Sequence, residues 1–198
     1  QYPYLPVLDE ILTHGEIEQE QDLGLVNIPL ELVVGTATSG RTNAFANNFM
    51  PLFDYDSEFG AKWINLCDSH LEEGINQPIK AYEYMNRFYV VEGNKRVSVL
   101  NYFDAATVLA EVTRKIPKRT EDPSNKIYYE FMSFYEITGM NTIYMSEEGK
   151  FSKLLEFVGE PEGEPWDSEV RMNFNSAFLK FKNAFFAKGG KKLSITPG

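Results

Sequence analysis

From residue 79 to residue 114 the chain reads IKAYEYMNRFYVVEGNKRVSVLNYFDAATVLAEVTR. The opening of this stretch alternates in polarity and is rich in aromatic residues, which predicts a β-strand, and the aromatic run after Asn86 predicts a second strand. Met85 and Asn86 connect the two, and because asparagine tolerates a positive φ the pair favours a tight hairpin. From Lys95 the apolar residues fall at helical spacing, so the second strand passes through Gly93 into a helix, and a further strand follows.

The junction between strand and helix is a candidate anion-binding site. The N-terminus of a helix presents backbone N–H groups that have no partner within the helix, together with the positive end of the helix dipole. Gly93 allows a ligand to approach the backbone, and Lys95 and Arg96 add two cations. This combination is typical of phosphate binding. A structural alternative is that Arg96 pairs with Glu92 or Glu111 and fixes the turn.

Residues 27–118 resemble the ParB/sulfiredoxin superfamily, which includes the N-terminal domain of chromosome-partition proteins and sulfiredoxin itself. The matching run reads QPIKAYEYMNRFYVVEGNKRVSVLNYFDA, and VLAEVTRKIP follows as a strand. Family members have a Gly-x-[His/Arg]-Arg box between a strand and a helix, which grips the phosphates of a nucleotide. In this chain the box reads Gly93-Asn94-Lys95-Arg96. The resemblance implies an α/β (α+β) fold with a small mixed sheet and helices.

The resemblance also implies a ligand and a set of ligand-binding residues. The box residues would hold the phosphates, with Asn94 adding a side-chain or backbone contact. Arg41 would approach from the loop that follows the first predicted strand. The implied ligand is a nucleoside triphosphate, CTP or ATP, bound with Mg²⁺. Glu92 is the catalytic candidate, as the residue that holds the metal or activates a hydroxyl group.

One departure from the family excludes an activity. Sulfiredoxin has a reactive cysteine immediately before the His-Arg of its box, and this chain has Asn94 at that position. The single cysteine, Cys67, is predicted on the apolar face of a helix that runs from Asp56 or Ser57 to Glu73. Because sulfinic-acid repair needs a thiolate at the phosphate site, we do not expect sulfiredoxin activity. Whether the chain is an enzyme of another kind stays open.

Composition limits the partners. The chain has 198 residues, of which 43% are hydrophobic, so it is long and apolar enough to form a sizeable core. With 19 Lys and Arg against 29 Asp and Glu, its net charge of −10 opposes binding to nucleic acid, and a DNA partner depends on a local basic patch. No apolar run reaches the length of a membrane span, and no signal-peptide pattern is present, so we expect no membrane partner and a cytoplasmic location. A homo-oligomer is left open.

No metal site is predicted. One cysteine excludes an internal disulfide framework and a cysteine-based zinc site. The two histidines, His14 and His70, do not have the spacing of metal ligands.

Three regions follow from the pattern: a lead-in segment over 1–26, the ParB/sulfiredoxin-like domain over 27–118, and a mainly helical C-terminal region over 119–198. The first predicted strand is LELVV, residues 30–34, and the polar loop GTATSGRTNAFANN follows it. That loop either reaches the ligand through Arg41 and its hydroxyl groups or is an ordered surface loop whose hydroxyls cap its own turns.

The C-terminal region is predicted to contain three helices and one short strand. The helices cover 127–138, a segment after Ser146 that includes 151–158, and 168–187, and the strand covers 141–145. The last helix has a stripe of phenylalanines, which is more typical of a core or a partner surface than of a platform for stacked bases.

The sequence therefore predicts a ParB-like domain that binds a nucleotide or another phosphate-bearing ligand, within a regulatory or DNA-associated protein. One alternative is a phosphotransferase or nucleotide hydrolase that uses the same site. A second is a protein-interaction module in which the site is vestigial. A binding module saturates without turnover, an enzyme releases phosphate or labels a substrate, and an interaction module does neither.

Overall fold

The computed structural model describes residues 4–12, 16–159 and 163–190, and the side chain of Arg41 lies outside the described part. The chain divides into two compact units, Gln1–Tyr128 and Tyr129–Gly198. Each unit is described by itself below. Within the described ranges no helix is both long enough and apolar enough to cross a membrane.

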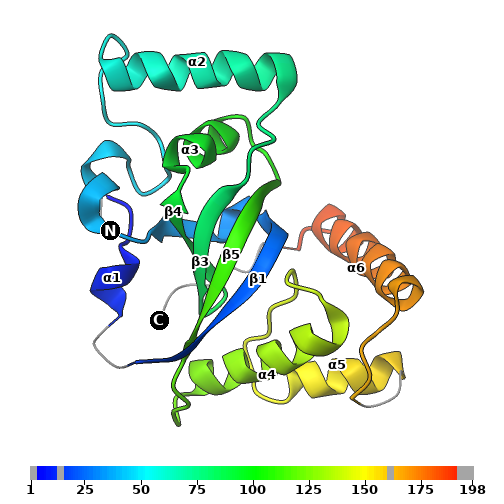
Figure 1. Ribbon diagram of the computed structural model, residues 1–198. Helices are drawn as coiled ribbons and strands as arrows, with labels where there is room; N and C mark the ends of the chain where they lie inside the picture. Colours follow the sequence, from blue (N-terminus) through cyan, green and yellow to red (C-terminus); the bar gives the residue numbers. More distant parts are fainter. Residues whose placement is uncertain (1–3, 13–15, 160–162, 191–198) are drawn as a thin grey trace. The chain divides into compact units, whose positions relative to one another are not determined.

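The first unit is built on a mixed five-stranded sheet with the strand order β1-β5-β3-β4-β2 (Figure 1). The strands are β1 (Ile17–Pro29), β2 (Val33–Thr36), β3 (Ile79–Tyr84), β4 (Arg87–Glu92) and β5 (Thr107–Pro117). Strand β3 is antiparallel to β4 and parallel to β5, while β1 is antiparallel to β5 and β2 is parallel to β4. The predicted α/β class is confirmed.

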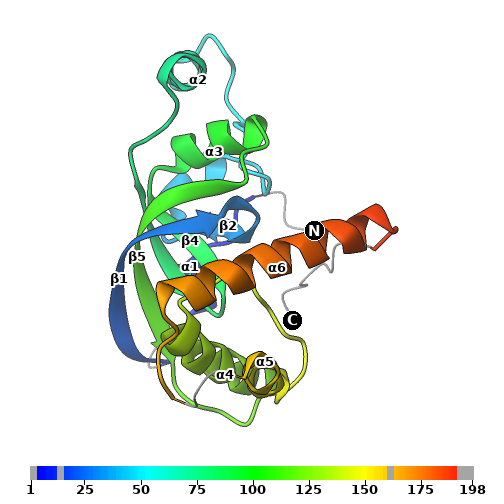
Figure 2. The ribbon, with the colours of Figure 1, turned by 90° about the vertical axis from the view of Figure 1, so that its right-hand side faces the viewer.

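The described part of this unit also contains α-helices and 3₁₀ helices. They are α1 (Leu8–Ile11), the 3₁₀ helices η1 (Leu30–Leu32) and η2 (Ser39–Ala44), α2 (Glu58–Glu73), α3 (Asn94–Tyr102) and the start of α4 (Pro123–Thr138). Figures 1 and 2 both place α2 beyond α3 at one end of the sheet. The indole of Trp63 on α2 donates a hydrogen bond of 2.9 Å to the hydroxyl of Ser98 on α3.

The predicted order of hairpin, glycine turn, helix and strand is confirmed. Met85 and Asn86 have φ angles of 51° and 60°, which is the geometry of a tight two-residue hairpin turn. The carboxylate of Glu83 accepts a hydrogen bond of 2.7 Å from the backbone N–H of Asn86, which fixes the turn to β3. The hairpin therefore delivers β4 directly to Gly93 and α3.

The buried face of the central strands combines an apolar core with one ion pair. Ile79, Ala81 and Glu83 share a face of β3, since alternate residues of a strand point the same way, and all three are buried. Arg114 of β5 lies beside Glu83 in the parallel register. Tyr128 of α4 completes this end of the core and is 1% exposed.

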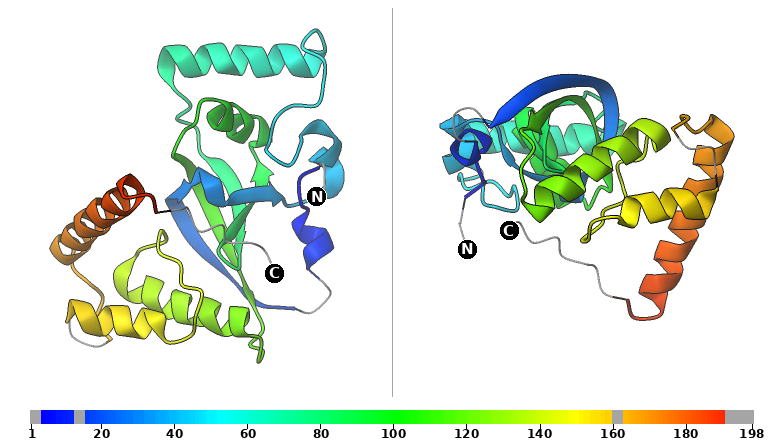
Figure 3. Two further views of the ribbon diagram at one scale, coloured as in Figure 1. Left: turned by 180° about the vertical axis from the view of Figure 1, so that it is seen from behind. Right: turned by 90° about the horizontal axis from the view of Figure 1, so that it is seen from below.

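The predicted lead-in segment contains most of β1. Residues 17–26 pair with β5 in an antiparallel ladder, which Figure 3 shows following β5 along its length. The acidic part of this segment is mostly exposed, but it is also strand. Because β1 is an edge strand, it lacks the apolar alternation that would have revealed it.

The strand predicted over 30–34 is partly wrong. Residues Leu30–Leu32 form η1, and β2 begins only at Val33. Leu30 and Leu32 are both buried, so they satisfy the alternation expected of a strand while the backbone turns. A short apolar run does not distinguish the two structures.

Helix α2 confirms the predicted cap and most of the predicted face. The hydroxyl of Ser57 accepts a hydrogen bond of 3.0 Å from the N–H of Gly60, and Cys67 is buried. Leu71, one turn further along the helix, is 68% exposed. At 3.6 residues per turn His70 is the residue that returns to the face of Trp63, and its ring lies 5.0 Å from that of Phe103.

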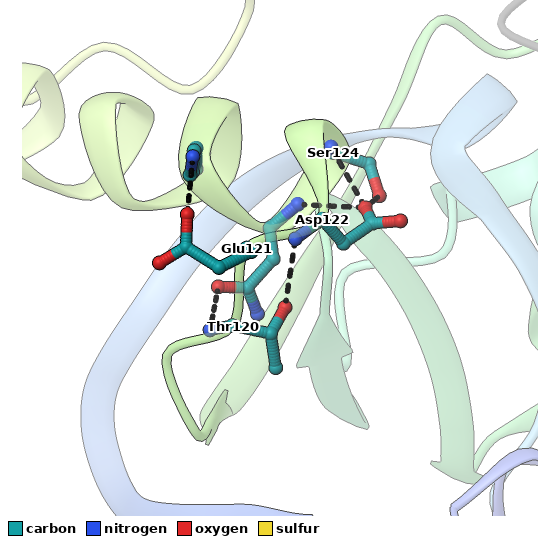
Figure 4. Close-up of polar contacts among 6 residues, drawn as sticks. Thr120, Glu121, Asp122 and Ser124 are labelled. Atoms are coloured by element: carbon teal, nitrogen blue, oxygen red, sulfur yellow. Dashed lines mark hydrogen bonds and ion pairs between the residues drawn. The ribbon is translucent and has the colours of Figure 1, made fainter.

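The connection before α4 is an ordered cap (Figure 4). The carboxylate of Asp122 accepts hydrogen bonds from the N–H groups of Ser124 (2.8 Å) and Asn125 (3.3 Å). The side chain of Asn125 in turn bonds the N–H of Thr120 and the carbonyl of Lys118, both at 3.0 Å. The segment KIPKRTEDPSNK, residues 115–126, thus ties the end of β5 to α4.

The second unit contains the end of α4 together with α5 (Lys150–Val158) and α6 (Ser168–Ala187). The predicted strand over 141–145 is wrong: the segment is irregular, with Ile143 buried and Tyr144 stacked on Phe131 at 6.3 Å. The described part of this unit contains no strand with which the segment 141–145 could pair. The N-cap of helix α5 is Gly149, and the N–H of Gly149 donates a hydrogen bond of 2.8 Å to the carboxylate of Glu130.

Helix α6 has the predicted bounds and a well-formed cap. Asp167 accepts hydrogen bonds of 2.9 Å from the N–H groups of Glu169 and Val170. Phe174 packs on Trp166, with ring centroids 5.2 Å apart. The far end of the phenylalanine stripe is not core, because Phe181 and Phe185 are 66% and 46% exposed.

Candidate functional site

A pocket of about 380 Å³ opens where β4 passes into α3. This volume lies within the range of small-molecule sites. One wall is the β4–α3 turn, and the other is apolar and comes from the loop before α2, from α2 itself and from β4. The lining residues are Phe45, Phe59, Leu66, Gln77, Val91, Glu92, Gly93, Asn94, Lys95 and Arg96.

Gly93 is required by the geometry of the turn. Its φ of 109° is in the left-handed region, and a Cβ at this position would lie 2.7 Å from Cγ2 of Ile79. Gly93 is also the N-cap of α3: its carbonyl accepts the first helical hydrogen bond, from Val97 at 3.0 Å, and no side chain caps the helix. The first turn of α3 therefore begins at the pocket with glycine as its cap.

Arg96 is fixed on one side by the backbone before β3. Its Nη1 donates to the carbonyl of Gln77 at 3.2 Å and to the carbonyl of Pro78. Its Nη2 lies 3.8 Å from the Glu92 carboxylate, and the side chain is 18% exposed. The pairing with Glu92 that we considered as a structural alternative is therefore present.

Lys95 connects the turn to α2. Its Nζ lies 4.4 Å from the centroid of the Phe59 ring, which is a cation–π contact. Glu58, next to Phe59, has a lowered pKa, first because Lys62 donates a hydrogen bond to it and last because Lys95 attracts its charge. The side chain of Lys95 thus reaches from the first turn of α3 to the start of α2.

Glu92 lies among cations. Its carboxylate is 3.8 Å from Nη2 of Arg96 and 3.9 Å from Nζ of Lys80, and its side chain is 63% exposed. No group of three or more His, Cys, Asp or Glu side chains in the described ranges is placed to hold a metal ion. Glu92 thus lies between two cations at the turn.

Asn94, the predicted contact residue of the box, is buried. It is only 8% exposed, and its Oδ1 is buried without a hydrogen-bond partner among the described groups. Buried polar atoms are nearly always paired, so this unpaired acceptor is an exception.

The loop before α2 contains Arg41, which the sequence analysis predicted to approach the ligand. Its backbone belongs to η2, and its side chain lies outside the described part. The hydroxyl of Thr42 donates to the carbonyl of Ser39 at 2.7 Å, as expected of an ordered loop that caps its own turns. Phe45, from the same loop, lines the pocket although the sequence analysis did not select it.

Comparisons with known proteins give a limited result. No family model matches the chain, and no curated protein matches it. Among solved structures, sulfiredoxin from Arabidopsis thaliana is similar, with 22% identity over 44% of this chain and 82% of that chain and a TM-score of 0.31.

Proposed function

We propose that the first unit binds a phosphate-bearing small molecule, a nucleoside triphosphate in the first instance, in the pocket at the start of α3. The observation that carries the proposal is the glycine-capped N-terminus of α3, which lies at a pocket together with Lys95 and Arg96. The first-turn amides and the helix dipole favour an anion at this position.

The local charge supports an anionic ligand although the whole chain is acidic. Lys80 and Arg96 flank the carboxylate of Glu92, and Lys95 adds a third cation at the turn, beside the ring of Phe59. The net charge of the chain is −10, so this cationic group is a local exception. The proposal does not extend to DNA, because a duplex would meet the acidic surface as well as the turn.

The apolar wall supports a ligand with more than phosphate. Phe45, Phe59 and Leu66 offer a surface to a planar or apolar group. A nucleotide combines phosphates with a planar base. Mg²⁺ would neutralise part of the triphosphate charge.

The test is calorimetric titration of the full chain with CTP, ATP and inorganic triphosphate, with and without Mg²⁺ and at matched ionic strength. Arg96→Ala should weaken binding about 10- to 150-fold, since a hydrogen bond to a charged group contributes roughly 1.5–3 kcal/mol. Lys95→Met should weaken it less, because an ammonium group is a flexible point charge. Lys153→Met, an exposed lysine of α5, is the control with the same charge change.

Because Arg96 also holds the carbonyls of Gln77 and Pro78, its variant needs a measurement of stability. A lower melting temperature for Arg96→Ala, with no nucleotide binding by either protein, would leave only the structural role. Saturable binding without phosphate release is the result expected of a binding module, and phosphate release would favour the enzyme.

A further inference from the structure

The one carboxylate at the phosphate site is poorly placed to serve as a strong ion-pair partner. Glu92 is the last residue of β4, directly before Gly93, and its side chain is 63% exposed. Its distances of 3.8 Å to Arg96 and 3.9 Å to Lys80 exceed the length of a hydrogen bond. Exposed pairs of this kind contribute little free energy, so the carboxylate can move into solvent at small cost.

Arg96, in contrast, is held in place independently of Glu92. Nη1 is bonded to two backbone carbonyls, which fixes the plane of the guanidinium group. Nη2 lies on the side of Glu92, where the nearest carboxylate oxygen is too distant for a direct hydrogen bond. One side of the guanidinium is therefore a positioned donor for a better anion, and phosphate makes short charge-assisted bonds with such a group.

We infer that Glu92 is an internal counter-anion of this site: it balances Arg96 and Lys80 when no ligand is bound, and a bound phosphate takes its place beside Arg96. The inference rests on the proposed function and concerns its regulation. Glu92 lowers the affinity for a polyphosphate, because its negative charge repels the ligand until the side chain moves away or the charge is screened. Mg²⁺ bound to the ligand reduces that repulsion.

This role predicts the opposite outcome from a catalytic or metal-binding Glu92. As a counter-anion, Glu92 weakens binding, and its neutral isostere should bind better in the absence of Mg²⁺. As a metal ligand, Glu92 would strengthen Mg²⁺-dependent binding, and the isostere should bind worse when Mg²⁺ is present.

The experiment compares Glu92→Gln with wild type by calorimetric titration with inorganic triphosphate and with CTP, with and without Mg²⁺. We expect Glu92→Gln to bind about three- to tenfold more tightly without Mg²⁺, as follows from removing one screened like charge near the phosphates. The difference should shrink when Mg²⁺ is added. The control is Glu121→Gln at the start of α4, which removes an exposed carboxylate paired with Lys126 at 2.7 Å and changes the net charge equally.

A second variant tests whether Glu92 acts through its position beside Arg96. Arg96→Lys keeps the positive charge but loses the planar guanidinium group. In that background the change in affinity caused by Glu92→Gln should become as small as the change caused by Glu121→Gln. Unchanged or weaker binding by Glu92→Gln, with binding by wild type intact, would overturn the counter-anion role and leave the proposed function standing. Failure of both proteins to bind any of the ligands would overturn both. Binding by Glu92→Gln alone would support both.

Discussion

Glu83 and Arg114 form an ion pair inside the first unit, with Oε2 of the glutamate 2.6 Å from Nε of the arginine. Their side chains are 2% and 4% exposed. The same Oε2 accepts a hydrogen bond of 2.9 Å from the hydroxyl of Tyr128, and the other carboxylate oxygen accepts the N–H of Asn86. One carboxylate thus joins β3, β5, α4 and the hairpin turn that leads to the candidate site.

Removing one partner of this pair should be costly. Arg114→Met leaves the Glu83 carboxylate buried without its cation, and breaking a buried pair in this way costs about 3–5 kcal/mol of unfolding free energy. Urea unfolding followed by circular dichroism measures the loss. Lys126→Met, which breaks the exposed pair with Glu121, is the control and should cost at most about 1 kcal/mol. Equal costs for the two variants would show that the buried pair has no special role.

Gly93→Ala should destabilise the first unit and abolish ligand binding. The new Cβ meets Ile79 and the φ of 109° is unfavourable for alanine, so we expect a cost of about 1–3 kcal/mol or more. Gly149→Ala is the matched control: Gly149 also precedes a helix with a positive φ, but nothing lies within 4 Å of its Cβ position. Thermal melts and triphosphate titration of both variants test this. A Gly93→Ala protein that melts and binds like wild type would contradict the account of the turn.

Cys67 should react slowly. Burial raises the pKa of its thiol, and the charge of Asp68 raises it further, so the thiolate fraction at pH 8 is below that of an ordinary cysteine. A disulfide-exchange reagent should label the native protein far more slowly than the urea-unfolded protein. Cys67→Ala should keep full ligand binding. Fast native labelling together with loss of binding in the alanine variant would assign Cys67 a role at the site.

The cap of α4 should depend on pH. The hydroxyl of Ser124 and then the N–H groups of Asn125 and Ser124 lower the pKa of Asp122. Because the folded-state pKa lies below the unfolded value, the carboxylate contributes stability above the unfolded pKa, near 3.9, and this contribution is lost as pH falls through the folded pKa. The difference in melting temperature between wild type and Asp122→Ala should therefore be largest near pH 7 and narrow towards pH 2. A difference independent of pH would contradict the role of the charge.

The sequence predicted the elements whose pattern is local. The hairpin from Ile79 to Glu92, the glycine turn and the cap of α2 each depend on residues close together in the chain, and all are confirmed. Strand β1 escaped prediction because an edge strand solvated on both sides has no apolar alternation. The irregular segment over 141–145 was misassigned because short apolar runs also pack without forming strand.

The sequence predicted the residues of the turn at the candidate site but not the residues of its apolar wall. Gly93, Lys95 and Arg96 are adjacent in the chain, so their grouping was visible. The apolar wall was not, because Phe45 and Phe59 reach the pocket from the loop before α2 and from α2 itself, and nothing local links them to the turn. The same holds for the carbonyls of Gln77 and Pro78 that fix Arg96, since these contacts exist only after the hairpin has folded.

The most direct measurement follows the backbone amide resonances of the ¹⁵N-labelled chain by NMR during titration with CTP and with inorganic triphosphate, with Mg²⁺ and at constant ionic strength. The account predicts saturable shifts concentrated on Gly93, Asn94 and Lys95, with smaller shifts at Phe59 for CTP alone, because only the nucleotide has a group for the apolar wall. Absence of any shift at millimolar ligand, or saturable shifts confined to residues away from the β4–α3 turn, would contradict it.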